Sequence, residues 1–286
     1  MNKLQSRIKN FVLFLLLIVL AVIFLSPYIW LGLSSFKTEG EIFQMPPTVF
    51  PNNPVTINYA RALSLTAQEG RANPLILPGL INSFQVGIIT TAILLIISSL
   101  AGYAFARLTF PGRTFLLILL LMLRMLPGIV LAVPVFIMAT KTRLLDTKLL
   151  LIIVYTAFNA PFSVWLLSVF FQEVPQELED AALVDGCTRF QLIRRIYIPL
   201  ALPAIATVGV LVFLAIWNEF LFGVLLTTTT AAKTAPVALA SLISARDTRW
   251  GIMTAGGILQ TIPALAVVIF MQRYIIKGLT FGAVKG

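Results

Sequence analysis

The chain has 286 residues, of which 59% are hydrophobic and only 11% are charged. This composition excludes a soluble globular domain, in which about 25% of residues are charged, and it also excludes intrinsic disorder. The single cysteine, Cys187, excludes a disulfide framework and a cysteine-based metal site, and the absence of histidine excludes histidine-based catalysis. The net charge of +10 fits basic residues around a membrane better than it fits a nucleic-acid partner.

Six stretches with at most one charge each are long enough to cross a membrane as helices, because about 20 helical residues span the ~30 Å hydrocarbon core. In chain order they cover residues 11–36, 79–106, 114–140, 149–172, 200–232 and 250–272. We therefore expect an all-α integral membrane protein with six transmembrane helices in a single domain over residues 1–286. Its parts are a first span with an outer loop (10–78), a core (79–272) and a tail (273–286).

The first span starts like a signal peptide, since Lys3, Arg7 and Lys9 precede its apolar run. The run continues to Leu33 without a small-x-small cleavage motif, which favours an uncleaved anchor. With the N-terminus inside, eleven Lys and Arg residues fall on the inner side and nine on the outer side. This small excess and the basic start predict that both termini are cytoplasmic.

Two of the predicted outer loops are long. The first, about residues 37–78, is rich in proline and asparagine and predicts an extended segment with a short helix near Asn58 to Leu65. The third, about residues 227–249, opens with four consecutive threonines and could be a solvated connector. On the inner side, Pro111-Gly112 predicts a turn between the second and third spans.

The inner loop over residues 173–199 is the most informative one. It holds five of the eleven acidic residues, namely Glu173, Glu177, Glu179, Asp180 and Asp185. Pro175 suits the start of a helix, Gly186 its end, and Thr188 the cap of a second helix. The loop therefore predicts a helix–Gly–helix elbow along the membrane surface, for which an ordinary amphipathic interfacial helix is the alternative.

At this loop the sequence resembles the inner-membrane permease subunits of binding-protein-dependent ABC importers. The stretch from Glu177 to Pro203, ELEDAALVDGCTRFQLIRRIYIPLALP, matches their cytoplasmic Glu-Ala-Ala, Gly and Ile-x-Leu-Pro motif. It departs from the family at Asp180, where Glu is usual, and at Cys187, where Ala is usual. Aspartate keeps the charge but shortens its reach, and the neighbouring Glu179 is placed to compensate.

Three further stretches extend the resemblance over essentially the whole chain, and they are similar to the maltose-type (MalG-like) carbohydrate permeases. They are Ala101–Arg113 (AGYAFARLTFPGR), Trp217–Phe220 (WNEF) and Gln272–Gly286 (QRYIIKGLTFGAVKG). The resemblance implies a type I ABC importer transmembrane domain in a bacterial-type inner membrane. It also implies a second permease subunit as heterodimer partner, two nucleotide-binding ATPase subunits, an extracytoplasmic sugar-binding protein and membrane lipid around the chain.

By the same resemblance, a coupling helix over residues 177–186 docks in a groove of the ATPase and moves as a rigid lever, which drives alternating access. The expected ATPase-coupling residues are Glu177, Glu179, Asp180, Ala181, Ala182, Asp185, Gly186, Ile198 and Pro199. The sequence contains no Gly-Lys dipeptide and hence no P-loop. We therefore expect no cofactor on this chain, with ATP and Mg²⁺ bound by the partner ATPases. The tail and the third outer loop are expected to contact the ATPase and the sugar-binding protein, respectively.

Polar residues inside the spans are the candidates for a substrate pathway. Trp217, Asn218 and Glu219 combine an aromatic face with hydroxyl-binding groups, as sugar recognition requires, and Asn82 is a further candidate. The alternative is that these groups only pair with neighbouring helices. Arg124 is expected to pair with a carbonyl or with Glu219 rather than with a ligand.

The expected function is thus the pore subunit of an ATP-driven sugar importer, without enzymatic activity of its own. A polyol or a glycerol phosphodiester remains an alternative cargo, although an anionic cargo would have only Arg124 to bind it. An integral membrane enzyme is disfavoured because the chain lacks histidine and a carboxylate pair within a span. An ion channel is disfavoured because the sequence shows no repeated filter or ring of charges.

Overall fold

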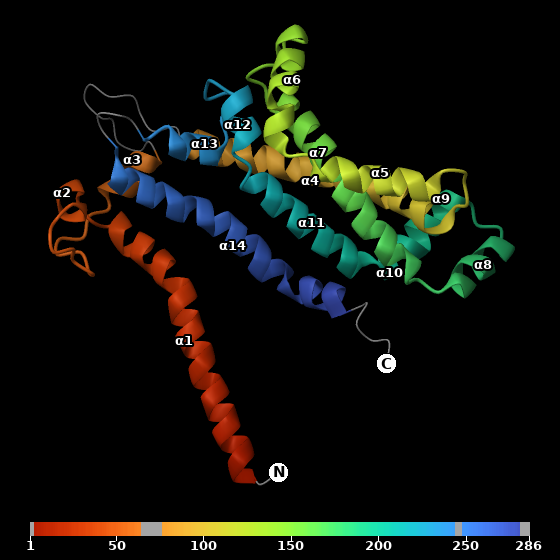
Figure 1. The fold of residues 1–286 in the computed structure, drawn as a ribbon, viewed down its shortest axis with the longest axis horizontal. Helices are drawn as coiled ribbons and strands as arrows, with labels where there is room; N and C mark the ends of the chain where they lie inside the picture. Colours follow the sequence, from red (N-terminus) through yellow and green to blue (C-terminus); the bar gives the residue numbers. More distant parts are fainter. Residues whose placement is uncertain (1–2, 64–75, 244–247, 281–286) are drawn as a thin grey trace. The chain divides into compact units, whose positions relative to one another are not determined.

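The computed structural model describes residues 3–63, 76–243 and 248–280, and every regular element in these ranges is helical (Figure 1). The longer helices are α1 (Lys3–Ser35), α4 (Ile76–Arg107), α5 (Arg113–Met125), α6 (Gly128–Lys141), α7 (Lys148–Gln172), α11 (Leu202–Trp217) and α14 (Trp250–Thr280). The shorter helices are α2 (Glu39–Ile42), α3 (Ile57–Ala62), α8 (Gln176–Val184), α9 (Arg189–Leu192), α10 (Ile198–Leu200), α12 (Leu221–Leu226) and α13 (Ala235–Ala240), with a π-helical turn, η1 (Ile193–Tyr197), between α9 and α10.

The expected number of spans agrees with these helices. By length and composition, four helical segments can each cross a membrane, namely residues 9–35, 76–107, 148–172 and 250–274. Two bent pairs, α5 with α6 and α9–α10 with α11, raise the number to as many as six spans. The short helix expected near Asn58 is α3. Residues 64–75 of the expected first outer loop, 244–247 of the third and 281–286 of the tail lie outside the described residues.

Two spans that the sequence predicted as continuous are broken. The third bends by 92° between α5 and α6, because Pro127 forces Leu126 before it into an extended conformation with ψ 123°. The fifth starts at Leu202 after an 80° bend, and it ends at Trp217 instead of continuing to residue 232. Composition measures apolar length, but it does not show where a proline or a capping side chain interrupts the hydrogen-bond ladder.

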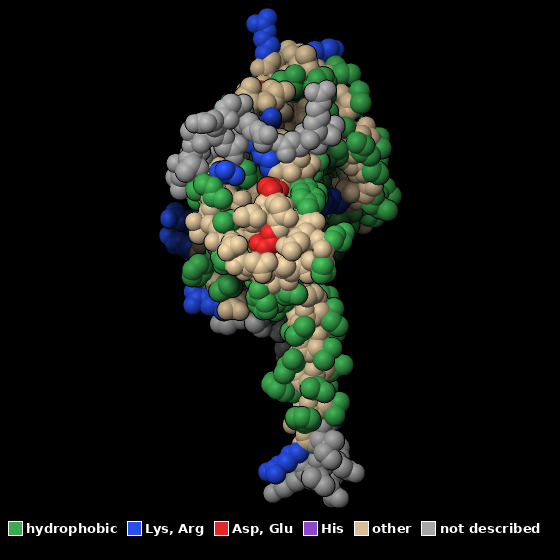
Figure 2. All heavy atoms as spheres, turned by 90° about the vertical axis from the view of Figure 1, so that its left-hand side faces the viewer, with side chains coloured by type: hydrophobic (Ala, Val, Ile, Leu, Met, Phe, Trp, Pro, Cys, Tyr) green, Lys and Arg blue, Asp and Glu red, His purple; other side chains and the backbone are tan. Residues whose placement is uncertain are grey.

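The described chain forms two compact units. The first comprises Met1–Ile76 and Leu239–Thr261, and it includes α1 to α3 and the start of α14. None of the residues in the apolar window of α1 is buried, and Figure 2 shows the hydrophobic side chains that cover this helix. Such an unpacked apolar helix is stable only in an apolar surrounding, as the interior of a bilayer provides.

A buried asparagine holds the first unit together. The Asn58 side chain donates hydrogen bonds to the carbonyl oxygens of Ser35 (2.9 Å) and Lys37 (2.8 Å) at the end of α1. A Cβ atom at position 251 would lie 2.7 Å from Asn58 Oδ1, so the start of α14 approaches this side chain as closely as only glycine permits. The backbone N–H of Gly251 donates to Glu39 Oε1 at 2.9 Å.

The second unit, Leu77–Ala238 and Ile262–Gly286, contains the main hydrophobic core. In this unit α7 packs against α5, α11 and α12, and Gly102 of α4 lies against Leu167 and Ser168 of α7. Large side chains with almost no exposed surface fill the space between these helices, including Tyr103, Leu151, Leu167, Phe171 and Tyr197. The elbow helices α8 and α9 lie at the end of this unit where α4 and α7 end (Figure 1).

Candidate functional site

The elbow, which we define as residues 176–197, forms from local sequence signals. Helix α8 ends at Val184, and Gly186 follows with a φ of +81°, in the left-handed region that favours glycine. Thr188 then caps α9, because its Oγ1 accepts the Gln191 N–H at 3.3 Å while the Gln191 side chain accepts the Thr188 N–H at 2.8 Å. The helix–Gly–helix structure predicted from the sequence is confirmed.

The carboxylate of Glu179 in α8 points into the protein rather than away from it. Only 6% of this residue is exposed. Its Oε1 accepts hydrogen bonds from the Tyr103 hydroxyl (3.0 Å) and from Arg189 Nη1 (2.8 Å), and its Oε2 accepts a hydrogen bond from the Tyr197 hydroxyl. A buried carboxylate is tolerated because these donors replace the water that it has lost.

Arg107 at the end of α4 extends this network to α7. Its Nε lies 3.8 Å from Glu179 Oε2, and its guanidinium stacks over the Tyr197 ring with 5.5 Å between Cζ and the ring centroid. Arg107 Nη2 also donates to the carbonyl oxygens of Phe171 (3.0 Å) and Val174, where α7 has ended and carbonyls have no helical partner.

These side chains form one cluster, the Glu179 node, which consists of Glu179, Tyr103, Arg107, Arg189 and Tyr197. Through it, α8 is attached to the C-terminal ends of α4 and α7, to α9 and to η1. Two guanidinium groups face a single carboxylate, which is the ion-pair partner of both among the described residues. The elbow is therefore not a loose loop but a helix fixed to the helices on both sides of it.

The outward side of the elbow is acidic and apolar. Glu177, Asp180 and Asp185 are exposed, as is Ala181, while Ala182 is half-buried. The exposed surface also includes Leu178, Leu183 and Val184. Beyond the elbow, Ile198 is half-buried and Pro199 is exposed, both in α10. The expected coupling residues thus share one segment, but Glu179 is set apart from the others by its burial.

The candidates for a substrate pathway are scattered over different environments. Trp217 is 1% exposed and stacks on Phe213 at 5.7 Å between ring centroids. Asn82 is also buried, and it donates to the carbonyl oxygens of Thr230 and Lys233 at 2.9 Å each, which attaches the third outer loop to α4. Asn218 is the exposed member of the set.

Glu219 caps a helix, a role that the sequence analysis did not assign to it. Its Oε1 accepts the Phe222 N–H at 2.9 Å and its Oε2 accepts the Gly223 N–H at 3.2 Å, at the start of α12. The Tyr155 hydroxyl donates to the same Oε2 at 2.6 Å. Arg124 donates to the Phe158 carbonyl oxygen at 3.3 Å, which confirms the expected pairing with a carbonyl.

A second connection on the third outer loop involves Asp146, which follows α6. Its Oδ1 accepts the backbone N–H groups of Thr228 (2.8 Å) and Thr229 (3.0 Å), and its Oδ2 accepts the Thr229 hydroxyl (2.5 Å). Burial alone would raise the pKa of this carboxyl group, but the hydrogen bonds from Thr229 and Thr228 outweigh it and lower the pKa below its usual value. We call this contact the Asp146 latch.

Sequence reasoning missed the partners of the Glu179 node and the Asp146 latch. The sequence analysis gives Tyr197 and Arg189 no role, and Tyr103 enters it only as part of the stretch Ala101–Arg113 that carries the family resemblance. Their meeting depends on contacts between residues up to 76 positions apart, as for Tyr103 and Glu179, and no local pattern encodes such a distance. Among the residues that the structure describes, no group of three or more acidic or cysteine side chains could hold a metal ion.

Comparison with known proteins agrees with this architecture. Residues 95–281 match the family described as binding-protein-dependent transport system inner membrane component. A trehalose transport system permease, SugB of Mycobacterium tuberculosis, is 43% identical over 72% of this chain and 76% of its own length. The trehalose/maltose transport system permease MalG of Thermococcus litoralis is 35% identical over 99% of both chains.

A solved structure establishes the fold. A chain of a bacterial ABC transporter that imports the acidic polysaccharide alginate superposes with a TM-score of 0.77, over 96% of this chain and 99% of its own, at 21% identity. At this identity the likeness concerns the fold alone. The all-α, type I importer fold that the sequence predicted is confirmed.

Proposed function

We propose that this chain, which belongs to the family of binding-protein-dependent transport system inner membrane components, is the pore subunit of an ABC importer that takes up a sugar or an oligosaccharide. The names of relatives support the class of cargo: trehalose, trehalose/maltose and arabinooligosaccharides are the substrates that three of them state. The chain itself is a transport subunit and not an enzyme.

The proposal includes three kinds of partner. A second permease subunit completes the pore, two ATPase subunits supply the energy, and an extracytoplasmic binding protein delivers the sugar. Separate ATPases are required because the sequence has no P-loop to hold ATP phosphates. ATP and Mg²⁺ therefore belong to the partner subunits.

In this mechanism the exposed side of α8 docks on the ATPase while its buried side holds the transmembrane helices. Exposed Asp180 and Asp185 offer charge to a basic groove, the small exposed Ala181 allows close approach, and the exposed leucine side chains offer apolar surface. When the ATPases close, the displaced α8 pulls the ends of α4 and α7 and the η1 turn through the Glu179 node. The bends before α11 and between α5 and α6 divide the spans into segments that can then tilt, which would open the pore alternately to each side.

The single observation that carries this proposal is the attachment of α8 through a buried carboxylate. A loop helix that only rested on the membrane would need no such connection to four other elements. A helix that acts as a lever needs this connection, because its movement reaches the transmembrane helices only through contacts that stay intact during the movement.

The first test of docking uses a charge reversal. Asp180→Lys should abolish co-purification of the ATPase with the permease pair in mild detergent. Glu173→Lys is the matched control, since Glu173 is equally exposed and acidic but precedes α8. Equal co-purification of both variants with the ATPase would refute docking through α8.

A second test uses two glycines with the same backbone conformation. Gly186 (φ +81°) lies in the elbow and Gly112 (φ +78°) in the turn between α4 and α5, and a Cβ atom at either would meet nothing within 4 Å. Alanine imposes on both the same strain of roughly 1–2 kcal/mol. Gly186→Ala should reduce the ATPase activity stimulated by a binding protein loaded with trehalose or maltose, whereas Gly112→Ala should not. An equal loss in both variants would contradict a special role for the elbow.

A further inference from the structure

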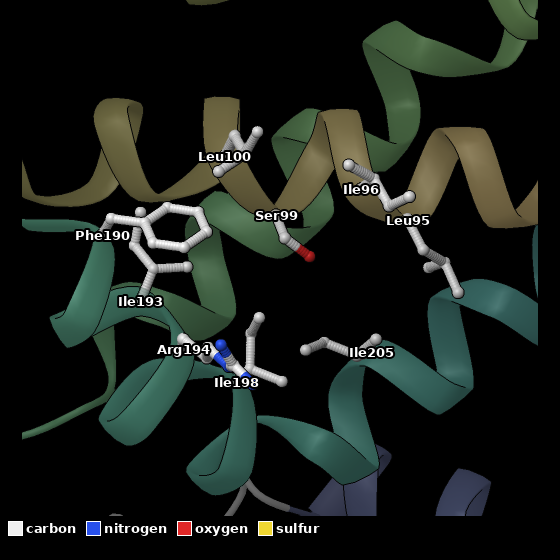
Figure 3. Close-up of a pocket in the computed structure, with 9 residues that line it drawn as sticks. All are labelled: Leu95, Ile96, Ser99, Leu100, Phe190, Ile193, Arg194, Ile198 and Ile205. Carbon is white, nitrogen blue, oxygen red and sulfur yellow. The ribbon is translucent and has the colours of Figure 1, made fainter.

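A cavity of about 380 Å³ opens in the second unit between α4 and the segment formed by η1, α10 and α11 (Figure 3). Most of its lining consists of leucine and isoleucine side chains, with Phe190 at the elbow end. The lining includes two polar residues, Ser99 of α4 and Arg194 of η1. This volume falls within the range of about 300–1,000 Å³ that is typical of small-ligand sites.

The Ser99 hydroxyl is directed into this cavity. The residue is 94% buried, as its exposed fraction is 6%, and Figure 3 shows its oxygen pointing into the space next to Arg194, Ile198 and Ile205. Within the described part of the chain, this hydroxyl forms no hydrogen bond. The oxygen is not among the fully buried, unpaired side-chain atoms of the described residues, so it is accessible from the cavity and can meet a polar group that enters from outside.

Arg194 supplies a charge across the cavity from Ser99. It is exposed, and no carboxylate in residues 3–63, 76–243 or 248–280 forms an ion pair with it. It belongs to the π-helical turn, a distortion that is frequent at functional sites. The cavity therefore offers an uncompensated positive charge next to an apolar space.

The polar groups of the lining lie at a shallower depth than its last apolar residues. Leu95 and Ser99 precede Arg107, the last residue of α4, by 12 and 8 residues, which corresponds to about 18 and 12 Å along the helix. Arg194 lies in the elbow, at the surface end. Arg194 and Ser99 thus lie nearer the elbow than Ile205 and Leu95, which line the part of the cavity that is about one leaflet deep.

We propose that this cavity binds an anionic phospholipid from the leaflet next to the elbow, with its phosphate on Arg194, a backbone ester oxygen near Ser99 and an acyl chain between α4 and α11. Water would not fill the space, because a water molecule needs two to four polar partners and an apolar cavity stays dry. Basic pockets between membrane helices are known to select anionic headgroups. The proposal depends on the chain lying in a membrane and not on its cargo or on its ATPase.

The test counts phospholipid bound to the purified complex of permease pair and ATPases by native mass spectrometry, after addition of phosphatidylglycerol or phosphatidylcholine. The wild-type complex should retain phosphatidylglycerol in preference to phosphatidylcholine. Arg194→Gln should retain about fivefold less phosphatidylglycerol, the loss expected for one basic residue at an anionic membrane surface. Arg195→Gln is the matched control, because Arg195 is exposed and adjacent but does not line the cavity.

Two further variants test the site in another way. Ser99→Val, which removes the hydroxyl at similar volume, should also weaken retention, and Ile205→Trp should exclude lipid by filling the cavity. Equal retention of the two lipids by the wild type, or equal losses for Arg194→Gln and Arg195→Gln, would overturn the proposal. Cross-linking of Leu100→Cys to the second permease subunit would identify a protein occupant and would overturn it as well.

Discussion

Glu177, Glu179 and Asp180 lie within four positions of one another, yet only Glu179 is buried. Helix geometry explains the difference, because residues three apart share a face and residues two apart do not. Glu177 and Asp180 therefore face outward together while Glu179 faces the helix ends of the second unit. The burial of Glu179 favours an anchoring role over compensation for the shorter Asp180.

The Glu179 node predicts a large loss of stability for one substitution. Glu179→Ala leaves the largely buried Arg107 without its counter-charge, and loss of one partner from a buried ion pair costs about 3–5 kcal/mol. The melting temperature of the purified complex should fall markedly. Glu177→Ala, on the exposed side, should leave it unchanged, and equal melting temperatures for the two variants would show that the node does not hold the elbow.

A pair of neighbouring residues separates structural from substrate-binding roles. Glu219→Ala removes the acceptor of two backbone N–H groups and of the Tyr155 hydroxyl, so we expect a loss of about 1–3 kcal/mol in stability. Asn218→Ala should preserve stability, because Asn218 is exposed and, within the described residues, its side chain donates only to the Leu214 carbonyl oxygen of the preceding helix. If Asn218 contacts sugar, its variant should raise the KM for uptake. A stable Glu219→Ala protein with impaired uptake would instead assign the sugar contact to Glu219.

At the scale of elements, interruptions in helices decide the arrangement more than hydropathy does. Pro127 separates α5 from α6, and the pair Pro199 and Pro203 flanks the bend before α11. A proline clashes with the carbonyl four residues before it, and Pro199 occupies that position relative to Pro203. Farther along, the Glu219 side chain caps the N-terminus of α12, within a stretch that the sequence predicted as one uninterrupted span.

The Asp146 latch predicts a pH dependence with a definite sign. The pKa of Asp146 is lower in the folded state than the unfolded value of about 3.9, so the latch contributes its full stabilisation above that value and loses it as pH falls through the folded pKa. Asp146→Asn tolerates the same positive φ of 61° but carries no charge. The difference in melting temperature between wild type and Asp146→Asn should therefore shrink as the pH falls below about 4. A difference that is independent of pH would contradict the latch.

At the scale of the whole molecule, the single cysteine reports on orientation. Cys187 follows Gly186 in the elbow and is partly exposed. If the N-terminus is cytoplasmic, a membrane-impermeant maleimide should label Cys187 in inside-out vesicles stripped of ATPase but not in intact cells. Thr230→Cys in a Cys187→Ser background, on the third outer loop, should show the opposite pattern. Labelling of Cys187 in intact cells would show that the topology is the reverse of the expected one. The elbow would then lie on the extracytoplasmic side, where it cannot meet an ATPase.

The sequence by itself determined the features that depend on local chemistry. Apolar length predicted the spans, and Gly186 and Thr188 predicted the elbow. Each of these follows from residues within one helix or turn, where backbone geometry fixes which neighbours interact.

Only the tertiary structure decided which way the charged and polar side chains of these segments face. It turned Glu179 toward Tyr103 and Arg107, used Glu219 as a helix cap, and left Ser99 and Arg194 beside an open cavity. The physical reason is that a buried polar group must find partners wherever the packed helices bring them. Those partners come from distant parts of the chain, and their positions are fixed by packing rather than by sequence spacing.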